Sequence, residues 1–216
     1  MKVWGLTGSI GMGKSTAARA FRRLGVPIFD ADAAVHGLQA RGGRAVRPIA
    51  REFPGTERHG ATDREALRAA VLGQPEALHR LERIIHPLVR EEQARFLARW
   101  RGRGARLVVL DIPLLFETRR DLREFDAILV VSAPAAIQRV RVLARRGMSE
   151  ARLAAIRARQ MPDAEKRRRA DVVIRTGLSR HHAQASVRKL VALADSPHAW
   201  TSGVRVGPRI RKHRDA

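Results

Sequence analysis

Short apolar runs alternate with segments of helical spacing along most of the chain. The apolar runs are continuous and rich in β-branched residues, as expected of strands that are buried on both faces of a parallel sheet. Segments with apolar residues three and four positions apart separate them, which is typical of helices. This alternation predicts an α/β fold with a parallel sheet. The predicted strands are residues 2–7, 26–29, 106–110, 127–131 and 171–174.

The stretch from residue 33 to about residue 101 differs, because its pattern is helical without convincing strands. We therefore expect a helical insertion in the α/β framework, with Thr62 or Asp63 capping one of its helices. Pro87 is expected to interrupt the helical pattern directly after His86. The predicted helices of the whole chain are residues 15–24, 63–72, 75–85, 88–100, 134–146, 149–159 and 179–194.

The last segment, residues 196–216, combines Gly, Pro and basic residues without an apolar period, so we expect it to be disordered. Residues 1–195 have the length of a single domain. The chain of 216 residues contains no cysteine, which excludes disulfides and thiolate metal sites. It also lacks a membrane-length apolar run and a secretory signal, so we expect a cytoplasmic protein without a membrane partner.

The charge balance is strongly basic, with 43 Lys and Arg residues against 21 Asp and Glu and a formal net charge of +22. Such a surplus favours polyanionic partners, which include nucleotides, nucleic acid and acidic membrane surfaces. A coding bias toward Arg and Ala explains the total charge about equally well. It explains the local excess of cations between residues 139 and 169 less well.

Residues 8–15, with the sequence GSIGMGKS, satisfy the P-loop pattern G-x-x-x-x-G-K-[ST] between a predicted strand and a predicted helix. The glycines let backbone N–H groups turn toward phosphate oxygens, and the following helix points its positive end at the same place. Lys14 is expected to reach the β- and γ-phosphates of ATP, and the Ser15 hydroxyl to bind Mg²⁺. The residues expected to hold the nucleotide are Gly8, Gly11, Met12, Gly13, Lys14, Ser15 and Thr16.

A P-loop alone does not separate kinases from other nucleotide-binding proteins. The short chain, the absence of a guanine-reading N-K-x-D sequence and the Arg-dense segment before the last strand favour a small-molecule kinase. A nucleoside or shikimate-type kinase would share these features. A nucleic-acid-binding protein that uses ATP as a switch would explain the charge, but the chain has few aromatic residues for stacking bases. We therefore expect no specific nucleic-acid partner.

Four further motifs carry a resemblance to a known family. They are Asp-Ala-Asp at residues 30–32, His-Pro-Leu at residues 86–88, DIPLLFE at residues 111–117 and the stretch from Gln160 to Gly177. With the P-loop, in this order and spacing, the chain resembles the dephospho-CoA kinase family from residue 1 to about residue 194.

The resemblance implies a nucleoside-monophosphate-kinase-like fold of the P-loop NTPase class, with a five-stranded parallel sheet and helices on both faces. It implies a helical acceptor-binding part at about residues 33–101 and an Arg-rich lid at about residues 139–169. The implied reaction transfers the γ-phosphate of ATP, with Mg²⁺, to the ribose 3′-hydroxyl of dephospho-CoA, giving coenzyme A and ADP. The oligomeric state is not predicted.

Asp32 is the candidate general base, because the end of the second strand lies beside the P-loop in such a sheet and a carboxylate there can take the acceptor proton. The resemblance gives the second Asp of this motif the same role. The alternative is that Asp32 caps a helix that begins at Ala33. Asp30 is a weaker candidate for the base.

Asp111 closes the third predicted strand, where P-loop enzymes often hold a carboxylate associated with Mg²⁺. Glu117 belongs to the motif that resembles the family and is a candidate for the acceptor site. Its alternative is a solvated helix acid. His86 is a further candidate for acceptor binding because of its His-Pro pair, and Arg64, with Arg90 as a weaker choice, is a candidate for the acceptor's pyrophosphate.

Arg141 and Arg145 are four residues apart, so a continuous helix would place both on one face of the lid. Either guanidinium could stabilise charge on the transferring phosphoryl group. The chain departs from the family pattern near the adenine, because Thr176 stands where many members have Asn before the glycine. Side-chain contacts to the adenine at this position stay open.

Overall fold

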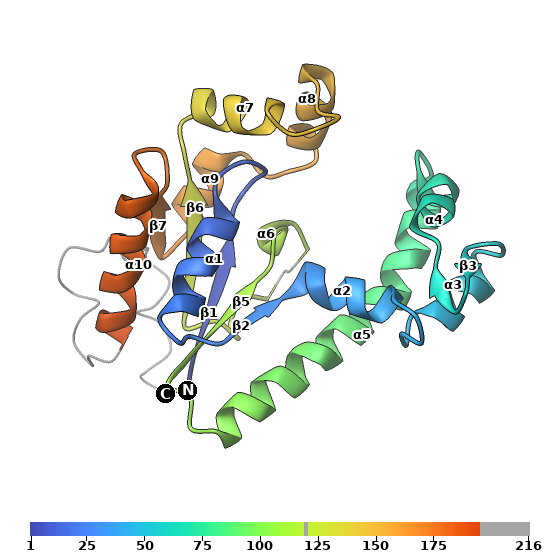
Figure 1. Cartoon of the computed structure of the whole chain (residues 1–216), viewed down its shortest axis with the longest axis horizontal. Helices are drawn as coiled ribbons and strands as arrows, with labels where there is room; N and C mark the ends of the chain where they lie inside the picture. The colour runs from blue at the N-terminus through green and yellow to red at the C-terminus, as the bar shows by residue number, and fades with distance from the viewer. Residues whose placement is uncertain (119–120, 195–216) are drawn as a thin grey trace. The chain divides into compact units, whose positions relative to one another are not determined.

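The structure is a computed structural model that describes residues 1–118 and 121–194. The expected disordered tail, residues 196–216, lies outside the described residues. The described chain forms two compact units, one made of Met1–Ile28 together with the chain from Gly104 onward, and the other of Phe29–Arg103. Figure 1 shows the helices and strands of both.

The first unit holds the sheet and its covering helices. Its elements, with the strand β2 that leads into the second unit, are β1 (Lys2–Thr7), α1 (Lys14–Arg23), β2 (Ile28–Asp30), β5 (Leu107–Asp111), α6 (Leu115–Thr118), β6 (Ala127–Ser132), α7 (Ala135–Leu143), α8 (Glu150–Ala158), α9 (Asp163–Arg169), β7 (Val172–Arg175) and α10 (Arg180–Ala194).

The sheet has five strands in the order β2-β5-β1-β6-β7, and β1 lies at its centre. Parallel pairing sets Trp4 opposite Val109 on one side and opposite Ala127 on the other, while β6 pairs in parallel with β7. The five-stranded parallel α/β fold expected from the sequence is confirmed. Parallel strands end at the same edge, so the segments that follow β1, β5 and β6 share that edge.

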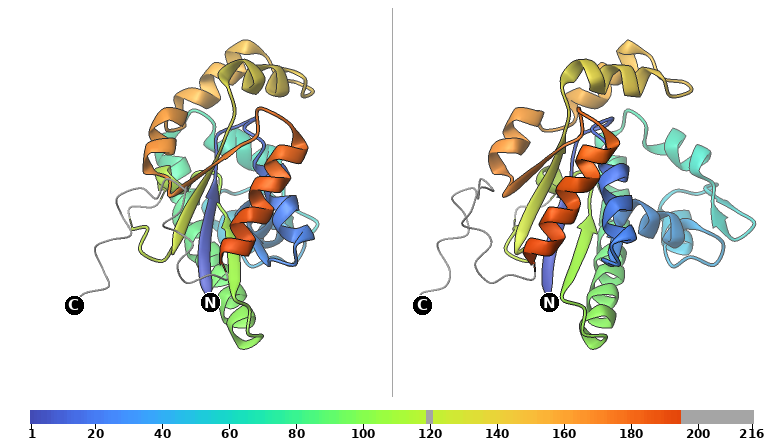
Figure 2. Two further views of the ribbon diagram at one scale, coloured as in Figure 1. Left: turned by 90° about the vertical axis from the view of Figure 1, so that its left-hand side faces the viewer. Right: turned by 60° about the vertical axis from the view of Figure 1, so that its left-hand side comes forward.

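Alternating residues of the strands fill two hydrophobic layers. One layer packs Trp4, Leu129 and Ile174 against α1 and α10, with Trp4 and Phe21 in an edge-to-face ring contact at 6.3 Å. On the opposite face, a Cβ added to Gly5 would lie 3.0 Å from Leu115, so α6 packs closely there. Figure 2 shows α1 and α10 on one side of the sheet and α9 on the other. Both faces are covered, which explains why the strands read as continuous apolar runs.

The second unit is mainly helical and has its own core. Its elements are α2 (Ala31–Gln39), α3 (Val46–Glu52), β3 (Glu57–Arg58), β4 (Ala61–Thr62), α4 (Arg64–Val71) and α5 (Pro75–Gly102). The core gathers Leu38, Ile49 and Leu67 among other apolar residues. The antiparallel pair β3–β4 was not expected, since strands of two residues leave no apolar alternation to detect.

The helix α5 corrects an expectation, because it runs unbroken through Pro87 for 28 residues. Packing of its apolar positions on α2, α3 and α4 outweighs the one backbone hydrogen bond that the proline removes. Rings of α5 also contact the start of the unit, with Phe29 and Phe96 5.6 Å apart and Phe96 and Trp100 6.4 Å apart. The entry and the exit of this inserted unit are therefore held together by aromatic packing.

No helix in the described part of the chain is long and apolar enough to span a bilayer.

Candidate active site

The P-loop joins β1 to α1 at the carboxyl edge of the sheet. Gly13 has φ 90° and directly precedes α1, and a Cβ at this position would lie 2.9 Å from the Thr176 hydroxyl oxygen. Gly11 has φ 74°, and a Cβ there would lie 2.5 Å from a methyl group of Val142. Larger residues are therefore excluded at both positions by backbone conformation and by space.

The amino end of α1 favours an anion. Gly13 has no side chain that could cap the helix, and no acidic residue stands in the first turn to neutralise its positive end. The exposed hydroxyl of Ser15 lies in this turn, immediately after Lys14. A helix end of this kind binds phosphate groups through its backbone N–H groups.

Thr176, which follows β7, is hydrogen-bonded to the P-loop. Its hydroxyl donates to the carbonyl oxygen of Met12 at 2.5 Å, and Arg141 donates to the Thr176 carbonyl oxygen at 2.7 Å. The side chain of Met12 is buried, and its sulfur accepts from the N–H of Ala133 at 3.2 Å. Met12 is thus 3% exposed, and it lines the cavity beside the P-loop. The sequence alone left the contacts of the Thr176 side chain undecided, and the structure shows that this side chain contacts the P-loop.

Lys14 and Asp111 form the main charged contact of the site. The Lys14 Nζ lies 2.5 Å from Oδ1 of Asp111, and the carboxylate side chain is 4% exposed. Lys14 begins α1 and Asp111 ends β5, so the parallel sheet itself brings the two charges together. Among the described residues no group of three or more acids and histidines could hold a metal by itself. A Mg²⁺ ion that arrives on a nucleotide needs only one or two protein oxygens.

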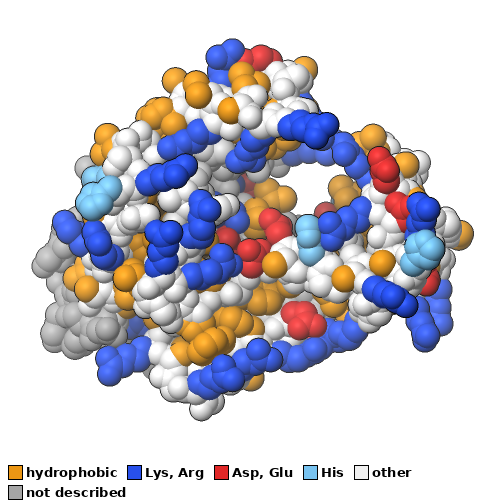
Figure 3. Space-filling model, viewed as in Figure 1, with side chains coloured by type: hydrophobic (Ala, Val, Ile, Leu, Met, Phe, Trp, Pro, Cys, Tyr) orange, Lys and Arg blue, Asp and Glu red, His pale blue; other side chains and the backbone are white. Residues whose placement is uncertain are grey.

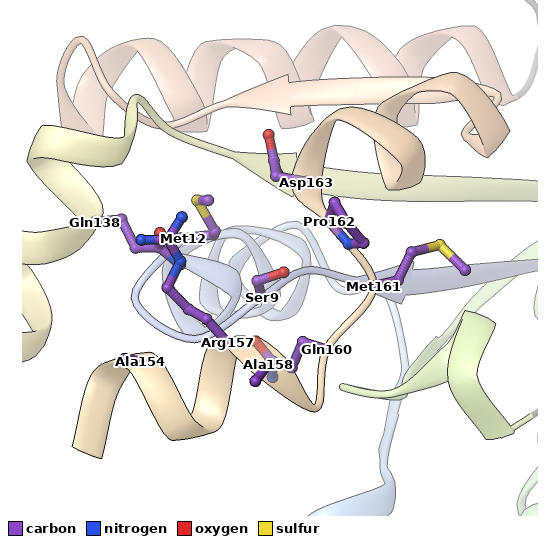
Figure 4. A pocket seen from close by; sticks show the side chains of 10 residues that line it. All are labelled: Ser9, Met12, Gln138, Ala154, Arg157, Ala158, Gln160, Met161, Pro162 and Asp163. Carbon is purple, nitrogen blue, oxygen red and sulfur yellow. The ribbon is translucent and has the colours of Figure 1, made fainter. Parts of the chain in front are cut away.

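A cavity of about 420 Å³ lies between the P-loop and the segment that carries α8 and α9. Figure 4 shows Ser9 and Met12 on the P-loop, Arg157 on α8, and Gln160 and Asp163 on the chain that follows α8. Arg157, on α8, is the cation that lines this cavity. Sequence reasoning missed Arg157, because its helical spacing does not distinguish it from its many neighbouring arginines.

The structure separates the two arginines that the sequence placed on one helix face. Arg141 lies in α7, whereas this helix ends at Leu143 and the exposed Arg145 follows it. The expectation of a shared helix face is therefore wrong. The N–H of Arg145 donates to the carbonyl of Val142 in the turn that ends the helix. Gly147 follows with φ 73°, a conformation that does not continue a helix.

Glu117 is not a solvated helix acid. Its Oε1 atom lies 2.8 Å from Nζ of Lys166 and accepts from the N–H of Met161 at 2.9 Å. The Lys166 side chain is completely buried, although it opens a run of four cations that looks like surface in the sequence. Glu117 thus joins α6 to the segment that begins α9. Its place in the acceptor site stays a prediction.

In the second unit, the structure assigns the cap of α2 to the first aspartate of the pair. The helix begins at Ala31, and Oδ1 of Asp30 accepts from the N–H of Ala33 at 3.0 Å. Asp32 lies in the first turn and is exposed. The alternative in which Asp32 caps the helix is therefore wrong, and its carboxylate is left accessible for chemistry.

The other acceptor candidates also lie on helices of the second unit. His86 is half-buried and Arg90 exposed on α5, and exposed Arg64 opens α4 directly after its cap Asp63. Asp63 accepts from two N–H groups of this helix. Of the two expected caps, Thr62 and Asp63, the structure therefore selects Asp63. The structure thus places these three residues in the inserted unit, and their role in acceptor binding stays a prediction.

Cations cover much of both units, as Figure 3 shows for the visible face, including α7 and α8. Some are neutralised locally. Arg44 lies 2.5 Å from Glu91, and this hydrogen bond holds the pKa of the Glu91 carboxyl below its ordinary value. The surface nevertheless stays strongly basic, which suits substrates that carry several phosphates.

Comparisons with known proteins agree with this geometry. A sequence model described as dephospho-CoA kinase matches residues 2–182. A dephospho-CoA kinase of Paramagnetospirillum magneticum is 62% identical over 167 residues, which are 77% of this chain and 78% of the relative. One from Brucella melitensis is 50% identical over 202 residues, covering 93% of this chain and 100% of the relative.

A crystal structure of a protein from Thermus thermophilus matches with a TM-score of 0.76 and 37% identity, and the match covers 88% of this chain and 96% of that one. The sheet order, the P-loop and these matches lead to one conclusion: the chain belongs to the dephospho-CoA kinase family.

Proposed function

We propose that the P-loop edge of the sheet binds ATP with Mg²⁺ and that its γ-phosphate passes to the ribose 3′-hydroxyl of dephospho-CoA. The observation that carries this proposal is the contact of Lys14 with Asp111 at the mouth of the P-loop. A lysine at the start of the helix after the P-loop and a carboxylate at the end of the neighbouring strand are the pair needed to hold phosphate oxygens and an associated cation.

The first unit supplies the phosphate site. The loop from Gly8 to Gly13 and the first turn of α1, including Ser15 and Thr16, would surround the α- and β-phosphates, while the Ile10 N–H stays bonded to Gln160. Lys14 then leaves Asp111 for the β- and γ-phosphate oxygens, which carry more negative charge than one carboxylate. This exchange of partners needs no backbone movement, because Lys14 has a flexible stem of four carbons.

Asp111 and Ser15 are the residues that would hold Mg²⁺. A carboxylate and a hydroxyl provide the hard oxygen atoms that this ion prefers. When bound, Mg²⁺ offsets negative charge on the β- and γ-phosphate oxygens.

The second unit supplies the acceptor chemistry. Asp32 takes the proton of the 3′-hydroxyl while that oxygen forms its bond to the γ-phosphorus, and the bond from the γ-phosphorus to the β-phosphate oxygen breaks. ADP leaves with the electron pair of the broken bond. Arg141 and Arg145, with Arg157, are the guanidiniums available to oppose the developing charge. His86, Arg64 and Glu117 bind the acceptor.

The test is formation of coenzyme A from ATP, Mg²⁺ and dephospho-CoA, measured by mass and retention time. Shikimate and nucleosides serve as competing acceptors. Asp32→Asn should lower kcat by at least about 10²-fold with ATP binding unchanged. Asp30→Asn keeps an oxygen that can cap α2, so it tests whether position 32 in particular holds the base. Equal losses in both variants, or preferential phosphorylation of another acceptor, would refute the proposal.

A further inference from the structure

The backbone of Ile10, at the tip of the P-loop, is bonded to two glutamines, one through its carbonyl oxygen and one through its N–H. The Nε2 atom of Gln138 donates to the Ile10 carbonyl oxygen at 2.8 Å. The N–H of Ile10 donates to Oε1 of Gln160 at 3.1 Å. Neither glutamine stands near the loop in the sequence, and both line the cavity beside it (Figure 4).

Each glutamine has a fixed orientation. The carbonyl of Ile10 requires a donor and its N–H requires an acceptor, so the partners determine which amide atom of each glutamine faces the loop. Gln138 is 3% exposed on α7, and burial leaves its side chain little freedom. Gln160 follows α8, and the next residue, Met161, is anchored through its N–H to Glu117.

The two glutamines also bracket one segment of the chain. Gln138 lies in α7, where the Arg-rich segment begins, and Gln160 lies just after α8, before α9 begins. Both ends of the α7–α8 segment are thereby bonded to the backbone of the same P-loop residue, Ile10. A change in the position of either end would pull on the loop that faces the phosphates.

We propose that Gln138 and Gln160 are positioning residues that set the conformation of the P-loop for ATP before the nucleotide arrives. This inference rests on the proposed function only in that the loop receives the phosphates of ATP. Ile10 lies between Gly8 and Gly11, and glycine flanks give a backbone many alternatives. Fixing the two peptide groups on either side of the Ile10 Cα removes those alternatives from the free protein, so ATP binding does not have to order the loop.

Four variants of the full chain test the clamp. Gln160→Met keeps the length of the side chain but has no amide acceptor for the Ile10 N–H, whereas Gln160→Glu keeps an acceptor. Gln138→Glu adds the same charge but sets a carboxylate against the Ile10 carbonyl, where a donor is required. Gln74→Glu, at an exposed position outside the site, is the control for added charge.

The primary readout is ATP affinity measured by calorimetry without acceptor, and the second is the KM for each substrate. Gln160→Met should weaken ATP binding about fivefold to tenfold. The ATP affinity of Gln160→Glu should be much closer to that of the parent, and that of Gln138→Glu should be the lowest of the set. The KM for dephospho-CoA should stay within about twofold of the parent value, because the clamp acts on the ATP loop. This readout separates the clamp from a loss of general stability, which would not affect one substrate alone.

ATP binding by Gln160→Met equal to that of the parent, or equal losses in the two Glu variants, would overturn the clamp. If Gln138→Glu fails to fold, the ATP affinities of Gln160→Met and Gln160→Glu, at a partly exposed position, decide whether the clamp exists. A parent protein that binds ATP but makes no coenzyme A would sink the proposed function and leave this test intact. Normal coenzyme A formation with unaltered ATP binding in the variants would sink the clamp alone.

Discussion

The Nζ atom of Lys166 lies 2.8 Å from Oε1 of Glu117, and the lysine side chain is fully buried. The same oxygen accepts from the N–H of Met161. One carboxylate oxygen therefore holds α9 and the segment before it against α6. A buried ion pair of this kind is costly to break from one side only, because the remaining charge keeps no partner.

Glu117→Gln should accordingly lower the free energy of unfolding by about 3 kcal/mol, since it leaves the Lys166 ammonium unneutralised. Lys166→Met should cost less, because the partly exposed Glu117 keeps its bond from Met161. Urea unfolding measures both, with exposed Glu150→Gln as the control. If Glu117 binds the acceptor, Glu117→Gln also raises the KM for dephospho-CoA under conditions where it is folded, while Lys166→Met does not.

Asp111→Asn should raise the Mg²⁺ concentration needed for half-maximal activity at least about tenfold, because an amide oxygen is a weaker ligand than a carboxylate. Initial rates over a Mg²⁺ titration at saturating ATP test this. The exposed Asp121→Asn, in the same unit, is the matched control. An unchanged Mg²⁺ requirement in Asp111→Asn would remove this residue from the metal site.

Thr176→Val should destabilise the protein by about 1–3 kcal/mol, because the buried carbonyl oxygen of Met12 loses its donor while the shape of the side chain is kept. Thr176→Ser keeps the hydroxyl and should retain most of the stability. Chemical unfolding of the two variants compares them directly. A Val variant as stable as the parent would show that this hydrogen bond contributes nothing net.

Arg157→Ala should lower kcat/KM for ATP about 10²-fold, because its guanidinium lines the cavity beside the P-loop. Arg159→Ala changes an exposed arginine two residues later that does not line the cavity, and it should stay close to the parent. Steady-state kinetics with ATP varied distinguish the pair. Similar losses in both would indicate that only the summed positive charge matters.

Pro87→Ala should stabilise the inserted unit by about 1 kcal/mol or more, since α5 continues through this position and alanine restores a backbone donor. Thermal unfolding measures the gain. The KM for dephospho-CoA gives a second readout, because loss of the proline changes the helix next to His86. A stabilised variant with an unchanged KM would argue against a role for this His-Pro pair in acceptor binding.

The sheet and the P-loop were predictable because their signals are local. A continuous apolar run identifies a buried strand without knowledge of the strands that pair with it. The glycine spacing of residues 8–15 is that of a P-loop and of few other structures. The place of Asp111 at a strand end was predicted, whereas its contact with Lys14 depends on the pairing of β5 with β1, which no local pattern predicts. The alternative in which Asp32 caps the helix was wrong, because two carboxylates two residues apart both suit a helix start and only the first turn of α2 decides between them.

Other features depend on contacts that no local pattern carries. The continuity of α5 comes from packing along its length, which outweighs a local helix breaker. Lys166 looks like surface within a run of cations, and only its pairing with Glu117 shows why one of them is buried. Gln138 and Gln160 are 22 residues apart in the sequence and meet at Ile10 only after the chain has folded.

The ring contact of Phe29 with Phe96 bears on the order of events during folding. β1 must pair with β5 across the whole inserted unit, as the register of Lys2 with Leu107 shows. If the inserted unit collapses first, this ring contact joins its two ends and removes most of the intervening chain from the loop. The entropy cost of closing that loop then falls by about 1 kcal/mol. Early formation of the helical insertion would thus speed the pairing of the central strands, so Phe96→Ala should slow refolding as well as destabilise the second unit.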